Sequence, residues 1–188
     1  MAVDLLDPPV ALPPRPHRSW LGRLLRRPAI LPDPRPEAAA VRELLEDARS
    51  VLLRGWVQDA WFVVRDRRGR PRPIGPCHLG RLDRADVAAA CLVGAVLQAA
   101  RLRRAAGHSD AGDAGLAVDL LWHTLREPPG STPTPAPSPA ARAARARDLS
   151  RWNDAPERSR EDVLALLDAA VLRSYPSAEI IRECATPR

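Results

Sequence analysis

The distribution of proline most strongly limits what this chain can fold into. There are 21 prolines in 188 residues, and nine of them fall within residues 1–36. Proline fixes φ and has no backbone N–H, so such clusters interrupt helices and sheets. We therefore expect a disordered tail over residues 1–36, a Pro-rich extended linker over residues 128–139 and a C-terminal turn or tail over residues 176–188. One short basic amphipathic island, residues 18–27, lies inside the first tail and is a candidate contact for a membrane surface or a partner groove.

Between these clusters, apolar residues recur at helical spacing. The pattern predicts helices over residues 37–54, 83–106, 110–126 and 140–150, and a last helix that begins at Ser159 and ends before Pro176. Asp162, three residues after Ser159, predicts an approximate capping box. Residues 87–100 carry no charge, so the second helix should be central, and Gly94 within it indicates close packing by another helix or an aromatic ring. Gly55 is expected to end the first helix in a left-handed conformation.

A short β-hairpin is predicted after the first helix. The run from Trp61 to Val64 is aromatic and β-branched, residues 66–69 have turn composition, and residues 71–74 supply a return strand. The predicted fold class is mainly α, with four to five helices around a central apolar helix and one short β-hairpin. These elements should form a single domain over residues 37–175.

Charge and cysteine content bear on the environment of the protein. All 29 basic side chains are arginine, and the formal net charge is +6. The absence of lysine is typical of a GC-rich genome, so any arginine cluster has a solvated surface as its simplest explanation. Three cysteines without a close pair favour free thiols in a reducing compartment. No secretory signal is recognised, and the longest uncharged run has 14 residues, short of the about 20 that span a bilayer. We expect a cytoplasmic protein without an integral membrane segment.

No nucleotide-binding, metalloprotease or serine-hydrolase motif occurs in the sequence. Cys91, His108, His123 and the adjacent pair Cys77–His78 suggest a zinc site or a Cys/His nucleophile. Their spacing does not match the close ligand pairs of structural zinc, and Cys91 lies in an apolar run. His123 is expected at the boundary of a helix. We therefore predict no metal, no cofactor and no catalytic residue.

The densest charge cluster is at the predicted hairpin tip, where Asp66 is the only acidic residue among five arginines: Arg65, Arg67, Arg68, Arg70 and Arg72. Exposed arginines near aromatic side chains are one pattern of nucleic-acid binding.

A second candidate site is the string that begins at Trp152. Trp152, Asn153 and Asp154 should form a turn before the last helix, with the Trp152 ring largely buried against the first or second helix and Asn153 or Asp154 accepting backbone N–H bonds of the turn. Arg158 should pair with a carboxylate. The alternative is a recognition site made by the same polar groups.

Three segments together resemble a known family. Gly55–Trp56–Val57–Gln58, Cys91–Leu92–Val93–Gly94–Ala95 and the string from Trp152 to Val163 occur in that order. They are similar to the motifs of a family of small, uncharacterised bacterial and phage-encoded proteins, catalogued as a domain of unknown function. The resemblance covers roughly residues 38–174; the chain departs from its pattern at Asp59, where the family has glycine, and at Glu157 and Ser159. It implies a helical fold with a small hairpin and no particular activity.

The sequence supports two hypotheses about function, and an enzyme of unknown class is a remote third alternative. The first is a small non-enzymatic binding or adaptor protein, with a protein partner that docks on Trp56, Gln58 and Trp61 or on Trp152, Asn153 and Asp154. The second is a nucleic-acid-associated protein that uses residues 65–72.

Overall fold

The computed structural model describes residues 34–75, 87–108, 113–128, 131, 133–136 and 138–175. Most of the predicted N-terminal tail, its basic island and the C-terminal residues 176–188 lie outside the described residues, as do Cys77, His78, Cys184 and the expected helix start at Asp83.

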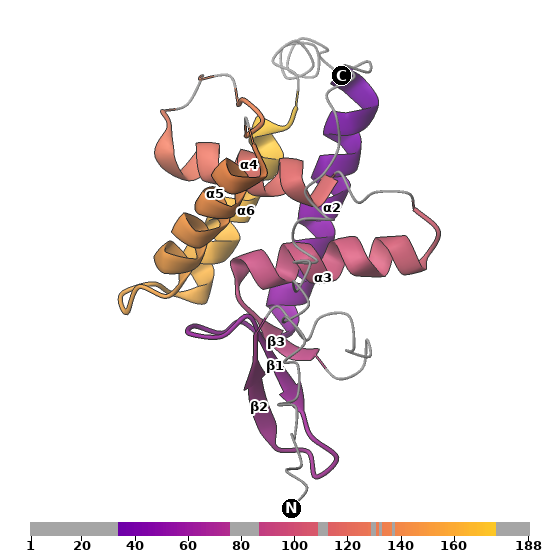
Figure 1. The fold of residues 1–188 in the computed structure, drawn as a ribbon, viewed down its shortest axis with the longest axis vertical. Helices are drawn as coiled ribbons and strands as arrows, with labels where there is room; N and C mark the ends of the chain where they lie inside the picture. Colours follow the sequence, from indigo (N-terminus) through magenta and orange to yellow (C-terminus); the bar gives the residue numbers. More distant parts are fainter. Residues whose placement is uncertain are drawn as a thin grey trace, which may run out of the picture.

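The described residues form five helices and one three-stranded antiparallel sheet (Figure 1). The helices are α2 (Pro34–Arg54), α3 (Leu92–Ala105), α4 (Asp113–Arg126), α5 (Pro139–Asn153) and α6 (Arg160–Arg173). The strands are β1 (Phe62–Arg65), β2 (Pro71–Ile74) and β3 (Val87–Ala90), in the order β2-β1-β3. The mainly α fold with a short hairpin is as predicted.

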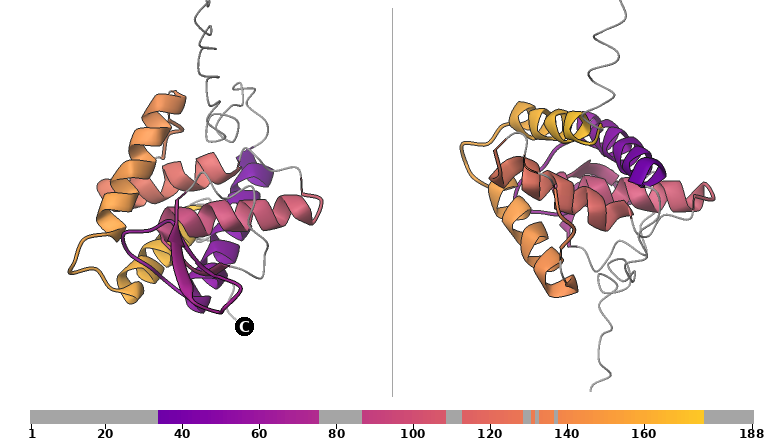
Figure 2. Two further views of the ribbon diagram at one scale, coloured as in Figure 1. Left: turned by 60° about the horizontal axis from the view of Figure 1, so that its bottom comes forward. Right: turned by 90° about the horizontal axis from the view of Figure 1, so that it is seen from above.

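Helix α3 occupies the centre, as the uncharged run up to Ala100 indicates. Every residue from Leu92 to Ala100 is buried, and the helix packs against α2, α4 and α5. Helix α2 also contacts α4 and α6, so the helices enclose one continuous core (Figure 2). The sheet lies at one end of this helical body.

The start of the central helix differs from the prediction. Val87–Ala90 is strand β3, which pairs with β1, and α3 begins only at Leu92 with Cys91 as its N-cap. Periodicity does not separate a buried strand from a buried helix when all residues are apolar. Tertiary pairing decides here, because the amide of Cys91 donates to the carbonyl of Trp61 at 3.1 Å.

Two glycines are explained by close packing. A Cβ at Gly94 would overlap the carbonyl oxygen of Trp61 and press on the Phe62 ring, which confirms the predicted aromatic neighbour. Helix α2 ends just before Gly55 as predicted, but the predicted left-handed conformation is wrong: the φ of Gly55 is not positive, and glycine is needed because the backbone of Ala88 lies against it.

Local signals explain the starts of α6 and α2. Helix α6 has the full capping box between Ser159 and Asp162. Helix α2 begins at Pro34, three residues earlier than predicted, although prolines were expected to prevent a helix there. Proline is tolerated in the first helical turn, where its missing N–H would have no partner.

Candidate functional site

The tip of the β1–β2 hairpin is held in a fixed conformation by Asp66. Its Oδ1 accepts the backbone amides of Arg68 at 2.8 Å and Arg70 at 2.9 Å, and its Oδ2 accepts Arg70 Nε at 3.0 Å. Gly69, with φ of 75°, completes the turn. These bonds, the one from the Arg70 amide first, lower the pKa of the Asp66 carboxyl. The turn therefore keeps its carboxylate ionised and occupied within the hairpin.

The five predicted arginines of the hairpin are all exposed. Arg70 is paired with Asp66, and Arg65 Nη1 donates to the carbonyl of Gly69 at 3.1 Å. Arg67, Arg68 and Arg72 form no ion pair with any described residue. We call this set of residues, Arg65, Arg67, Arg68, Arg70 and Arg72, the arginine hairpin.

The outer strand of the hairpin carries two prolines. Strand β2 is at the edge of the sheet, and Pro71 and Pro73 pair with Arg65 and Val63 of β1. Proline has no N–H to donate, so this edge is poorly suited to the addition of another strand.

The second predicted group of residues comes together at a buried junction centred on Asn153. Asn153 is fully buried, and its Oδ1 accepts the indole N–H of Trp56 at 2.9 Å and the amide of Leu92 at 3.1 Å. Its Nδ2 donates to the carbonyl of Val57 at 3.1 Å and to Asp154 Oδ1 at 2.8 Å. Both donors and the acceptor of the amide are thus used inside the protein. We call Trp56, Val57, Gln58, Leu92, Asn153 and Asp154 the Asn153 junction.

Gln58 and Asp154 extend this junction. Gln58 Nε2 donates to the carbonyls of Asn153 and Ala155, and Asp154 Oδ1 accepts the amide of Asp59 at 3.1 Å. Asp59 has φ of 59°, a left-handed conformation that glycine adopts most easily.

Three expectations for the Trp152 string are wrong. Trp152 and Asn153 form the last turn of α5, with Asp154 as its C-cap, instead of a separate turn. Trp152 is only partly buried and lies beside Leu125 and Arg126 of α4, in a shallow cavity of about 290 Å³ that Asp148 and Arg151 complete. The amides that Asn153 and Asp154 accept come from distant segments and not from the turn itself.

Arg158 and Trp61 have modest roles in the structure. The guanidinium carbon of Arg158 lies 4.3 Å from the centre of the Trp152 ring. Its contacts with the carboxylates of Glu157 and Asp162 are long, at 3.9 Å each. Trp61 is partly buried against the core just before β1.

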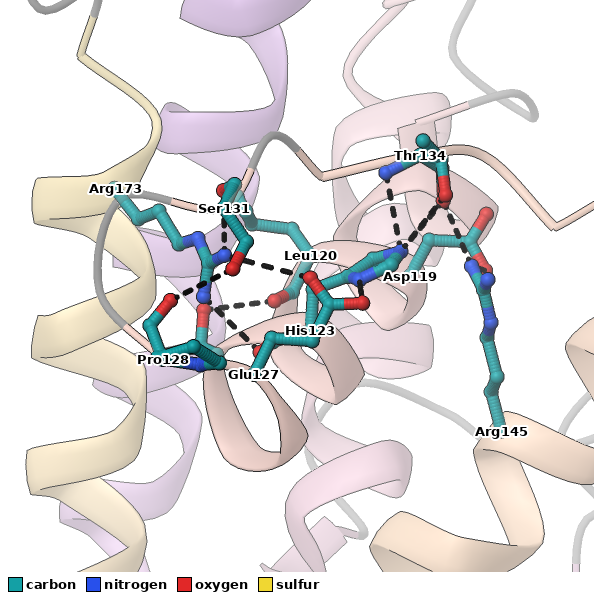
Figure 3. Close-up of polar contacts among 10 residues, drawn as sticks. Asp119, Leu120, His123, Glu127, Pro128, Ser131, Thr134, Arg145 and Arg173 are labelled. Atoms are coloured by element: carbon teal, nitrogen blue, oxygen red, sulfur yellow. Dashed lines mark hydrogen bonds and ion pairs between the residues drawn. The ribbon is translucent and has the colours of Figure 1, made fainter.

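A buried polar cluster on α4 was missed by the sequence reasoning (Figure 3). His123, expected at a boundary, is only 2% exposed. Its Nδ1 lies 2.7 Å from Glu127 Oε1, without the alignment of a hydrogen bond, and its Nε2 lies 2.7 Å from the carbonyl oxygen of Thr134. The regular spacing of Asp119, His123 and Glu127, four residues apart, was the available signal, since such residues share one helix face.

The same cluster holds part of the predicted extended linker against the helices. Asp119, 3% exposed, accepts the amide of Ala136 at 2.9 Å and is paired with Arg142 and Arg145. Arg173 Nη2 donates to the carbonyl of Ser131 at 2.6 Å. Residue 131 and residues 133–136 are therefore packed onto the domain and do not act as a free spacer.

Cys91 has a structural position. Its Sγ accepts the amide of Gly94, and burial raises the pKa of the thiol to about 11. A thiol with a raised pKa is a poor nucleophile at neutral pH. Among the described residues, no three His, Cys, Asp or Glu side chains are grouped so that they could hold a metal ion. None of the helices in the described ranges is long and apolar enough to cross a membrane.

The chain belongs to a family of unknown function, DUF6197, whose model matches residues 36–173. No curated protein and no solved structure matches the chain.

Proposed function

We propose that this protein is a cytoplasmic, non-enzymatic binding protein, and that its ligand is a nucleic acid bound through the arginine hairpin. One observation carries the proposal. Five exposed arginines surround a rigid turn, and the only carboxylate among them, that of Asp66, is used by the turn itself. The positive charge of the tip is therefore available to an external anion.

Arginine suits this role on physical grounds. The guanidinium group is always charged and its donors match the geometry of phosphate oxygens. The tip is fixed by the bonds of Asp66, so little conformational entropy is lost in the backbone when a ligand binds. A formal net charge of +6 also favours the approach of a polyanion.

The alternative sites for a protein partner have less support. Asn153 is 0% exposed, and the Trp56 indole N–H and the Gln58 amide already have partners within the chain. A ligand at these groups would have to break existing bonds in a buried setting, which is costly.

The test is salt-dependent binding of labelled DNA and RNA to the full chain, measured by fluorescence anisotropy. We expect affinity to fall as salt rises, with a slope of about −0.7 to −0.9 per neutralised phosphate in logarithmic terms. The double variant Arg67→Gln/Arg68→Gln should bind several-fold more weakly and show a shallower slope.

A matched control removes the same charge elsewhere. Arg104 and Arg147 are exposed on α3 and α5. The variant Arg104→Gln/Arg147→Gln should bind nearly as the wild type does. Equal losses in the two double variants would mean that overall charge, and not the hairpin, is responsible. No binding of any DNA or RNA at low salt would refute the proposal.

A further inference from the structure

We infer that the arginine hairpin binds duplex DNA by entering its major groove. The inference rests on the proposed function and names the form of nucleic acid that the hairpin fits. Three independent features of the hairpin lead to it: the placement of its arginines on both faces, its lack of an exposed aromatic platform and the chemistry of its free edge.

The strand register places arginines on opposite faces of the ribbon. Val64 is paired with Arg72, and the next pair along is Arg65 with Pro71. Directly paired side chains share a face, and successive pairs alternate between faces. Arg65 and Arg72 therefore lie on opposite faces, while Arg67 and Arg68 lie at the tip between them. Positive charge surrounds the ribbon instead of covering one side.

This arrangement fits a groove better than a flat surface. The major groove of B-DNA is about 12 Å wide and admits a two-stranded β-ribbon. Phosphates border the groove on both sides, so a ribbon with arginines on both faces reaches both borders at once. Strand β3 pairs with β1 only as far as Val64, so among the described strands the tip from Arg65 to Pro71 is the part that extends as a two-stranded ribbon and can enter the groove. The major groove of duplex RNA is deep and narrow and does not admit such an element.

A single strand is a poorer match. Proteins that bind single strands stack bases on exposed aromatic side chains. Phe62 is the one aromatic residue of β1 and β2, and it is 0% exposed because its ring packs in the core. The hairpin therefore offers charge without a stacking surface.

The free edge of the hairpin also disfavours a peptide. A peptide that added a strand to β2 would need backbone donors along that edge. Pro71 and Pro73 occupy two of the four positions of β2 and donate none. A ligand of the hairpin would therefore be bound by the arginine side chains and not by backbone pairing with β2.

The experiment measures the affinity of the full chain for three probes of one sequence: duplex DNA, single-stranded DNA and duplex RNA. Each probe is about 20 nucleotides or base pairs long, and all are measured at the same low salt concentration. We expect duplex DNA to bind about tenfold more tightly than the other two. Methyl green, which occupies the major groove, should displace the protein, and the minor-groove ligand netropsin should not.

Single variants test the two faces. Arg65→Gln and Arg72→Gln should each weaken duplex binding by about 3- to 10-fold, because each removes contacts with one border of the groove. The single variant Arg104→Gln is the control and should bind as the wild type does. Unchanged thermal melts of all three variants should show that the fold is intact.

The outcomes separate the two claims. No binding of any of the three probes would refute the proposed function. Binding of single-stranded DNA or duplex RNA as tight as that of duplex DNA would refute groove entry and leave the proposed function standing. Sensitivity to only one of Arg65 and Arg72, or displacement by netropsin, would also refute groove entry.

Discussion

The Asn153 junction and the arginine hairpin use polar residues in opposite ways. At the junction, the side-chain amide of Asn153 has four partners and is fully buried. At the hairpin, Asp66 is the only side chain with a comparable set of bonds, and the arginines around it are exposed. One group of residues holds segments together, and the other leaves its charge facing solvent.

The comparison shows that the most distinctive motif of the sequence has a structural role in the fold. The string Trp152–Asn153–Asp154 stands out because a buried amide with several backbone partners tolerates few replacements. The arginine run looks ordinary in a chain without lysine. Its structural role is small, and its proposed role is in binding outside the chain.

The largest expected effect is at the junction. Asn153→Ala leaves the Trp56 indole N–H, the Leu92 amide and the Val57 carbonyl without their partner. At about 1–3 kcal/mol for each buried unpaired group, the free energy of unfolding should fall by at least about 3 kcal/mol. Urea denaturation measures this change.

If Asn153→Ala does not fold, a milder variant keeps the prediction testable. Trp56→Phe removes a single donor to Asn153, and we expect a loss of about 1 kcal/mol. If both variants melted at the wild-type temperature, a structural role for the junction would be contradicted. The junction would then again be a candidate binding site.

The next effect concerns the contact between α3 and the sheet. Gly94→Ala should destabilise the protein by about 1–3 kcal/mol, because the added methyl overlaps the Trp61 carbonyl and the Phe62 ring. Gly75→Ala is the control, since no atom of the described residues lies within 4 Å of a Cβ there and its φ is not positive. A Gly94→Ala variant as stable as the control would show that β1 and α3 can separate without cost.

A smaller effect is expected at the start of α6. Ser159→Ala should cost about 1 kcal/mol through the loss of an N-cap, measured by thermal or urea denaturation at neutral pH. Hydrogen bonds from Ser159, chiefly from its backbone amide, lower the pKa of Asp162 below its ordinary 3.8. The contribution of ionised Asp162 is thus present above about pH 4 and lost as the pH falls through its folded pKa. The gap between wild type and variant should narrow at acid pH; a gap that widens there would contradict this account.

The smallest effect on stability is expected at the arginine hairpin. Arg67→Gln/Arg68→Gln should change the free energy of unfolding by less than about 0.5 kcal/mol, since neither side chain is paired with a described residue. The same variant should have the large effect on nucleic-acid binding described above. A strong loss of stability would mean that these arginines support the fold, and the contrast between the two regions would disappear.

Much of the local structure was determined by the sequence alone. The helices over α2, α4 and α6, the hairpin turn at residues 66–69 and the capping box at Ser159 depend on residues within one or two turns of each other. Capping, turn formation and amphipathic spacing are local effects, and they can be recognised without knowledge of the fold. The mainly α class follows from them.

Tertiary structure decided the rest, because the interactions join residues far apart in the chain. Asn153 is 61 residues from Leu92 and 97 from Trp56, so its burial has no local signature. Residues 87–90 became a strand because β1 offered hydrogen-bond partners, although their composition suits a helix as well. Residues 133–136 were predicted as a linker and are fixed by Asp119, His123 and Arg145, which lie on two different helices. Desolvation and distant pairing select among conformations that local preference leaves nearly equal in free energy.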